Sequence, residues 1–160
     1  MAASSANALS NGRLSVTEGP LQDACLPADG LPRPRGDIWE IPFAGADLFE
    51  LRQLVWSWAT KEALGGEATE ELVLAVHEVA TNSVRHGGGV GMLRLWRTGE
   101  ELVCEIQDAG YIRDPLGPRH LPGSEAAASR GLWITEQICD LVEIASSPRG
   151  SQVRMHKRLD

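Results

Sequence analysis

Hydrophobic and polar residues alternate along five short stretches of the chain, and this period of two is typical of strands that bury one face. In the first stretch Ile38 and Glu40 share one side, and Pro42 is expected to end the strand and to place it at a sheet edge. The predicted strands lie at residues 37–42, in a hairpin within residues 90–110 that turns at residues 98–100, and at residues 142–146 and 152–158.

Three other stretches repeat hydrophobic residues every three or four positions, which is the pattern of an amphipathic helix. The first predicted helix spans Ala46–Leu64 and stops at a pair of glycines. The second spans about Thr69–His86, has acidic residues in its first turn and ends at three glycines. The third spans about Arg130–Cys139.

The order of these elements predicts an α+β fold, a two-layer sandwich in which three helices cover one face of a mostly antiparallel sheet. Residues 109–129 hold several glycines and prolines and little periodicity, and so long a loop in a compact domain is a candidate lid. Residues 1–36 also lack periodicity and are predicted to form a flexible leader. The remaining residues, 37–160, are expected to form one domain.

Composition narrows the class of protein. A chain of 160 residues with a net charge of -7 lacks the concentrated basic surface that direct nucleic-acid binding needs. No apolar run reaches the roughly 18 residues that span a bilayer, so no membrane segment is expected. The three cysteines lack the spacing of a zinc site or a disulfide framework, which indicates reduced thiols and favours the cytoplasm.

The second predicted helix carries residues suited to a metal-bound triphosphate. Glu78 and Asn82 lie four residues apart and therefore share a face, opposite the hydrophobic stripe. Glu78 can accept a proton from a hydroxyl, and Asn82 offers a neutral oxygen ligand for Mg²⁺. Arg85 and His86 continue this face with donors that suit phosphate. Taken alone, such a face is more often simply solvated.

Further signals follow the predicted hairpin and open the third helix. Asp108 stands at a strand end, where it can accept a hydrogen bond from an exocyclic amine, and Gly110 lets the backbone turn against a flat ring. Gly131 lets phosphate oxygens approach the free amides of a helix start. Ser151 can reach a base through water. Each of these signals alone also fits an ordinary turn, helix start or solvated strand.

Together and in this order, the pieces resemble the ATPase superfamily of gyrase, histidine kinases and MutL, whose nucleotide-binding domain has the Bergerat fold. EVATNSVRHG is similar to its N-box, DAG to its first glycine box, and SRGLWITEQICD to the second box of anti-sigma-factor serine/threonine kinases. The resemblance covers about Asp37–Leu159 and implies Glu78 as catalytic base, Asn82 as Mg²⁺ ligand and Asp108 as adenine contact. It also implies ATP-binding roles for Arg85, His86, Gly87, Gly110, Arg130, Gly131, Leu132, Trp133 and Ser151.

Two positions depart from the pattern of this superfamily. Its first glycine box usually reads Asp-x-Gly-x-Gly, whereas Ile112 stands at the second glycine. Before Gly131 the chain has Ser129 and Arg130, where a further glycine is common. Both departures predict a lid hinge that is stiffer than usual.

The resemblance leaves two functions open. One is a serine/threonine kinase that holds a sigma factor inactive and transfers the γ-phosphoryl group of Mg-ATP to an anti-anti-sigma antagonist. The other is a non-catalytic module that binds its partner in a nucleotide-dependent way. Glu78 and Asn82 favour the first, and Ile112 favours the second. The catalytic half of a sensor histidine kinase fits less well, because no dimerising helix pair with a phosphoacceptor histidine is expected upstream. A homodimer is compatible with either function.

Overall fold

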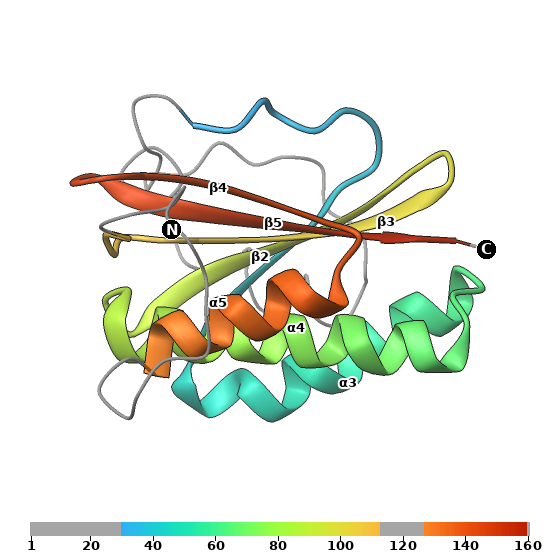
Figure 1. Ribbon diagram of the computed structural model, residues 1–160, viewed down its shortest axis with the longest axis horizontal. Helices are drawn as coiled ribbons and strands as arrows, with labels where there is room; N and C mark the ends of the chain where they lie inside the picture. Colours follow the sequence, from blue (N-terminus) through green and yellow to red (C-terminus); the bar gives the residue numbers. More distant parts are fainter. Residues whose placement is uncertain (1–29, 113–126, 160) are drawn as a thin grey trace.

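The computed structural model describes residues 30–112 and 127–159. Five strands form one sheet in the order β1-β2-β3-β5-β4, and every neighbouring pair in it is antiparallel (Figure 1). β1 is an edge strand, as its proline predicted. The strands are β1 (Trp39–Ala44), β2 (Val90–Thr98), β3 (Glu101–Asp108), β4 (Leu141–Ser147) and β5 (Gly150–Arg158).

Three α-helices cover one face of this sheet, which is the lower face in Figure 1. α4 and α5 lie next to the sheet, and α3 lies below α4. A short 3₁₀ helix, η2 (Gly45–Asp47), leads into the first of them. The α+β sandwich with helices on one face is therefore confirmed. The helices are α3 (Leu48–Lys61), α4 (Gly66–His86) and α5 (Ala127–Ile138).

The hydrophobic core lies between the sheet and these helices. Alternate residues of the strands point into it. α3 contributes its predicted hydrophobic stripe with Leu51, Val55 and Trp58, and α4 contributes the hydrophobic stripe that lies opposite Glu78 and Asn82. Burial of these side chains is the main force that holds the two layers together. The largest fully buried apolar side chains are Ile41, Leu51, Leu72, Leu93, Leu95, Leu102, Ile106 and Met155.

Several element boundaries differ from those that the sequence predicted, including both ends of α3. β1 continues through Pro42 to Ala44, because an edge strand does not need the missing amide of proline on its outer side. α4 begins at Gly66, where the amide of Thr69 donates to the carbonyl of Gly65 at 2.8 Å. α5 begins at Ala127, so the last three residues of the predicted loop are helical, and Gly131 is the fifth residue of the helix and not its start as predicted. Residues 109–112 of that candidate lid are described, while residues 113–126 lie outside the described residues.

The face of the sheet away from the helices carries a row of buried charges. Glu40, Arg94, Glu105 and Arg154 occupy successive register positions on β1, β2, β3 and β5. Arg94 donates to Glu40 at 3.1 Å and to Glu105 at 2.9 Å, and Arg154 donates to Glu105 at 2.8 Å. All four side chains are buried, and a buried charge is costly unless an opposite charge pairs with it.

The segment 30–38 runs over this face, on the side of the sheet opposite the helices (Figure 1). The amide of Leu31 donates to Oε1 of Gln152, and Arg154 donates to the carbonyl of Pro32. Ile38 forms a second small hydrophobic cluster with Trp96 and Val103. The end of the predicted leader thus contacts the domain, while residues 1–29 lie outside the described part of the chain.

Cys104 and Cys139 are free thiols, and Cys25 lies outside the described residues. Burial raises the pKa of Cys104 well above its ordinary value, and nearby Cys139 adds to this effect. Burial also raises the pKa of Cys139 to about 12, against the opposing effect of Lys157. Both thiols therefore keep their protons at neutral pH. None of the helices within residues 30–112 and 127–159 is long and apolar enough to cross a membrane.

Candidate nucleotide site

Asp108 ends β3 and is held by three hydrogen bonds. The hydroxyl of Ser83 on α4 donates to Oδ2 at 2.6 Å, and the hydroxyl of Ser151 on β5 donates to Oδ1 at 2.9 Å. The amide of Gly110 also donates to Oδ1, at 2.8 Å. A carboxylate accepts about four hydrogen bonds. The described residues therefore leave one acceptor position on Oδ2, in a carboxylate whose orientation is fixed from three sides.

Two glycines allow the backbone to pass close to this carboxylate. A Cβ on Gly87 would lie 2.4 Å from Cγ of Asp108 and 2.8 Å from the carbonyl oxygen of Ser83. A Cβ on Gly110 would lie 2.9 Å from both Cα of Gly87 and the carbonyl oxygen of His86. Unbonded carbon and oxygen atoms do not approach so closely, so only glycine fits at either position. The end of α4 and the turn after β3 thus meet without side chains between them.

Glu78 and Asn82 of α4 precede Gly87, and both side chains lie close to Gly131 of α5. A Cβ on Gly131 would lie 3.1 Å from Oε2 of Glu78 and 3.3 Å from Nδ2 of Asn82. The carbonyl of Gly131 accepts a hydrogen bond from the buried hydroxyl of Thr135 at 2.8 Å, which helps to fix this turn of α5. The predicted catalytic base, the predicted metal ligand and the glycine of the second box therefore lie together.

The remaining predicted residues occupy three different environments. Arg85, His86 and Arg130 are exposed, and Trp133 is half-buried. Leu132 is 5% exposed and belongs to the hydrophobic core, so its side chain serves packing and only its backbone remains available to a ligand. The polar line that continues from Glu78 towards the end of α4 is thus partly solvent-facing.

Two polar residues of this region were missed by the sequence analysis. Ser83 binds Asp108, although 25 positions separate them, and Thr135 binds the carbonyl of Gly131. Ser83 follows Asn82 directly and faces the core side of α4, where a polar residue among Val79, Ala80 and other apolar residues needs a partner. A serine within the hydrophobic stripe of the predicted helix was the signal in the sequence that could have identified Ser83.

Glu78 and Asn82 suit a magnesium ion that takes most of its ligands from the nucleotide and from water. Oxygen atoms of Glu78 and Asn82 are the type that Mg²⁺ prefers, and Mg²⁺ in nucleotide sites usually takes one or two protein ligands together with phosphates and waters. Within the described residues, no group of three or more histidine, cysteine, aspartate or glutamate side chains is placed to hold a metal. A site supplied chiefly by the nucleotide is consistent with both observations.

Comparison with known proteins shows the family and the fold of the chain. The family model described as histidine kinase-like ATPase domain matches residues 41–157, which contain most of β1 and β5, all of the elements between them and every predicted site residue. No curated protein matches the chain.

A solved structure has a similar fold. It is the crystal structure of the RsbU and RsbW domains of Rv1364c from Mycobacterium tuberculosis, with a TM-score of 0.56 and 16% sequence identity. The match covers 81% of this chain and 33% of that one, so the chain spans about a third of the length of the solved protein. At this identity the likeness concerns the fold.

Proposed function

Because this chain belongs to the family of histidine kinase-like ATPase domains, we propose that it binds ATP at the site around Asp108. The observation that carries the proposal is the fixed carboxylate at the end of β3, with one acceptor position left among the described residues. The exocyclic amine of adenine donates a hydrogen bond, whereas guanine presents an oxygen acceptor at the same position. A fixed carboxylate therefore favours adenine over guanine.

The phosphate groups are proposed to lie towards Glu78, Asn82 and Gly131. Asn82 would supply a ligand to Mg²⁺, whose charge neutralises the phosphates. Gly131 lies close to both side chains, and its lack of a side chain would leave room for the phosphates there. The exposed side chains of Arg85, His86 and Arg130 are additional donors that suit anionic oxygens.

We further propose that the chain is a protein serine/threonine kinase of the anti-sigma-factor type. Glu78 would remove the proton from the acceptor hydroxyl of an anti-anti-sigma protein, and a sigma factor would be the second partner. The resemblance of SRGLWITEQICD to the second box of these kinases supports this assignment, as does the fold shared with a chain that contains an RsbW domain. Both partners would place the activity in the cytoplasm.

Two binding measurements test the nucleotide site. Calorimetry should show that Mg-ATP binds. ATP should bind at least about tenfold more tightly than GTP, because guanine would leave the buried carboxylate of Asp108 without its hydrogen-bond donor. Asp108→Asn should weaken ATP binding and reduce this preference, since its amide can donate to guanine. Equal affinity for both nucleotides would contradict the role of Asp108, and no binding at millimolar ATP would contradict the site as a whole.

The kinase is tested by phosphate transfer from labelled ATP to a serine of an anti-anti-sigma protein. Glu78→Gln keeps the shape of the side chain and should lower the transfer rate by about 10² to 10⁴, with ATP affinity little changed. Glu70→Gln, an exposed glutamate on the same helix, is the matched control and should behave as the wild type. Transfer at the wild-type rate by Glu78→Gln would exclude Glu78 as the base.

A non-catalytic nucleotide-dependent anti-sigma module is the second candidate, and Ile112 is the observation that favours it. Its amide donates to Oγ of Ser146 on β4 at 2.8 Å, and its side chain packs against the core. The backbone after Gly110 is therefore anchored where a second glycine is common in the superfamily. Nucleotide binding and sigma-factor binding without any phosphate transfer by the wild type would support this candidate over the kinase.

A further inference from the structure

Residues 108–112, the Asp108 turn, lead from the end of β3 to the edge strand β4. Ser151 binds the carboxylate of Asp108 at the start of this turn, at 2.9 Å. At its end the amide of Ile112 donates to the hydroxyl oxygen of Ser146 on β4, at 2.8 Å. A serine hydroxyl therefore holds each end of the turn.

Asp108, Ser151 and Ser146 form one row across three neighbouring strands. Asp108 of β3 pairs with Ser151 of β5, and Ser151 pairs with Ser146 of β4. The three side chains share one face of the sheet, because register partners point the same way. Adjacent strands lie about 4.8 Å apart, so the row spans roughly 10 Å from Asp108 to Ser146. The Asp108 turn therefore passes β5 on its way to β4.

The turn has little slack. Four residues lead from Asp108 to Ile112, and an extended chain spans at most about 3.3 to 3.6 Å per residue, or roughly 14 Å in all. Between these ends the amide of Ala109 donates to the carbonyl of Gly87, the residue after α4, at 3.3 Å. The position of Ile112 at Ser146 thus limits the paths that the backbone can take past the end of α4.

Ile112 is held in two different ways. Its side chain packs against the hydrophobic core, and its amide donates to Ser146. Apolar packing has no preferred direction, whereas a hydrogen bond does. Ser146 therefore orients the peptide group that ends the turn, which packing of the side chain alone does not do.

We propose that Ser146 is a positioning residue for the adenine side of the nucleotide site. Its hydroxyl fixes the end of the Asp108 turn, so that Asp108 and Gly110 present a preformed surface to a flat base. Without this bond the ligand must order the turn, and the entropic cost lowers its affinity. The inference rests on the proposed binding of ATP around Asp108, and Ser146 acts through Ile112 without touching the nucleotide.

Calorimetry with Mg-ATP and Mg-ADP tests this role in three variants of the full chain. Ser146→Ala should weaken both nucleotides by the same factor, about threefold to tenfold, which corresponds to the net effect of one hydrogen bond. The factor should be equal because the two ligands share the base and differ only in the γ-phosphate. Ser146→Thr keeps the hydroxyl and suits a strand, so it should restore the wild-type affinity.

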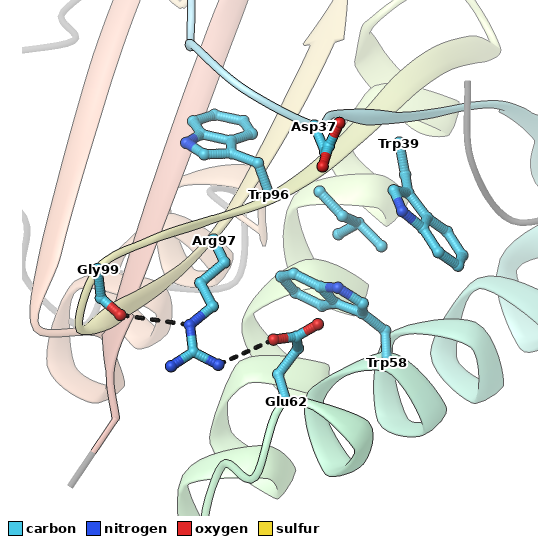
Figure 2. Close-up of a pocket in the computed structure, with 8 residues that line it drawn as sticks. Asp37, Trp39, Trp58, Glu62, Trp96, Arg97 and Gly99 are labelled. Carbon is cyan, nitrogen blue, oxygen red and sulfur yellow. Dashed lines mark hydrogen bonds and ion pairs between the residues drawn. The ribbon is translucent and has the colours of Figure 1, made fainter. Parts of the chain in front are cut away.

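Ser147→Ala is the matched control. Ser147 is the next residue of β4, and its hydroxyl oxygen also accepts a backbone amide, that of Arg149 at 3.1 Å, outside the Asp108 turn. A second control, Glu62→Gln, disrupts the ion pair with Arg97 beside the pocket at the opposite end of β3 (Figure 2). Both controls should bind ATP and ADP as the wild type does. The melting temperatures of all variants should be similar.

Hydrogen exchange tests the contact itself on the chain without nucleotide. The amide of Ile112 should exchange at least about tenfold faster in Ser146→Ala than in the wild type, because it loses its acceptor. In Ser146→Thr the exchange of this amide should be slow again. The amide of Val153, in the middle of β5, should exchange at the same rate in every variant.

Four results would overturn the inference. They are unchanged ATP affinity in Ser146→Ala, unchanged exchange of the Ile112 amide, an equal loss of affinity in Ser146→Thr, and a larger loss for ATP than for ADP, which would place the effect at the γ-phosphate. Each of them leaves nucleotide binding by the wild type intact. Absence of binding by the wild type contradicts the proposed function instead, and the inference falls with it.

Discussion

The hydroxyl of Ser83 on α4 lies 2.6 Å from Oδ2 of Asp108 at the end of β3, and both side chains are buried. This hydrogen bond joins the helical layer to the sheet at the candidate nucleotide site. Ser151 binds the other oxygen of the same carboxylate from β5. The orientation of Asp108 thus depends on contacts from two neighbouring elements as well as on its own strand.

Ser83→Ala should weaken ATP binding and lower stability. The buried carboxylate loses one of its donors, which costs about 1 to 3 kcal/mol, and the freed Oδ2 is no longer held in one orientation. Urea unfolding and calorimetry with Mg-ATP measure the two effects. Ser57→Ala, at an exposed serine of α3, is the control and should change neither quantity. Unchanged ATP affinity in Ser83→Ala would mean that the orientation of Asp108 is set without Ser83.

Gly87→Ala should disrupt the site by steric overlap. The added Cβ would lie 2.4 Å from Cγ of Asp108, while the φ of Gly87, -105°, is one that alanine tolerates. The expected loss is therefore due to displacement of Asp108, of order 1 to 3 kcal/mol in stability, together with loss of ATP binding. Gly66→Ala, where nothing lies within 4 Å of the new Cβ, should be neutral or slightly stabilising. Similar behaviour of the two variants would refute the close contact.

Gly131→Ala should separate stability from binding. The new methyl group would lie 3.1 Å from Oε2 of Glu78 and must push it or Asn82 aside by a few tenths of an ångström. Alanine favours the helix by about 1 kcal/mol over glycine, so the melting temperature should be maintained or raised. Affinity for Mg-ATP should nevertheless fall. An unchanged affinity would show that Glu78 and Asn82 act apart from this turn of α5.

The buried charge row should contribute strongly to stability. Glu105 is fully buried and bonds both Arg94 and Arg154, so Glu105→Ala leaves two buried guanidinium groups without their shared carboxylate. We expect a loss of about 3 to 5 kcal/mol in urea unfolding. The control is Arg97→Ala, which removes an ion pair whose side chains are 49% and 32% exposed, and should cost no more than about 1 kcal/mol. Comparable losses would contradict the burial of the row.

Stability should fall at alkaline pH because of the thiols. The folded chain keeps its protons on Cys104 and Cys139, whose pKa values burial has raised, Cys139 to about 12. The unfolded chain loses these protons from about pH 9 upwards, so it binds fewer protons and the free energy of unfolding declines, by about 1.4 kcal/mol per pH unit and thiol at most. The stability is fully present below pH 9. Urea unfolding between pH 8 and pH 11 should show a smaller slope in Cys139→Ala, and an equal slope would assign the decline to other groups.

Much of the architecture was predictable because it follows from local periodicity. The stripe of α4, the hairpin of β2 and β3 and the edge position of β1 all came from the spacing of apolar residues and from Pro42. The same alternation puts Lys157 and Arg154 on opposite faces of β5 in the structure, where they contact Glu71 and Glu105. Precise ends, such as the start of α5 at Ala127, depend on capping and packing that the pattern does not encode.

The candidate site was predictable to the same extent: features within one element followed from the sequence, and contacts between elements did not. The sequence by itself determined that Glu78 and Asn82 share a helix face, that Asp108 ends a strand and that Gly131 belongs to a helix, since each statement concerns residues within one element. Only the tertiary structure decided that Ser83 holds Asp108, that Gly87 must lack a side chain beside Asp108 and that Glu105 binds Arg154. These contacts join residues from 21 to 49 positions apart in the chain, and their partners are chosen by how the strands and helices pack, which no local pattern of hydrophobic and polar residues records.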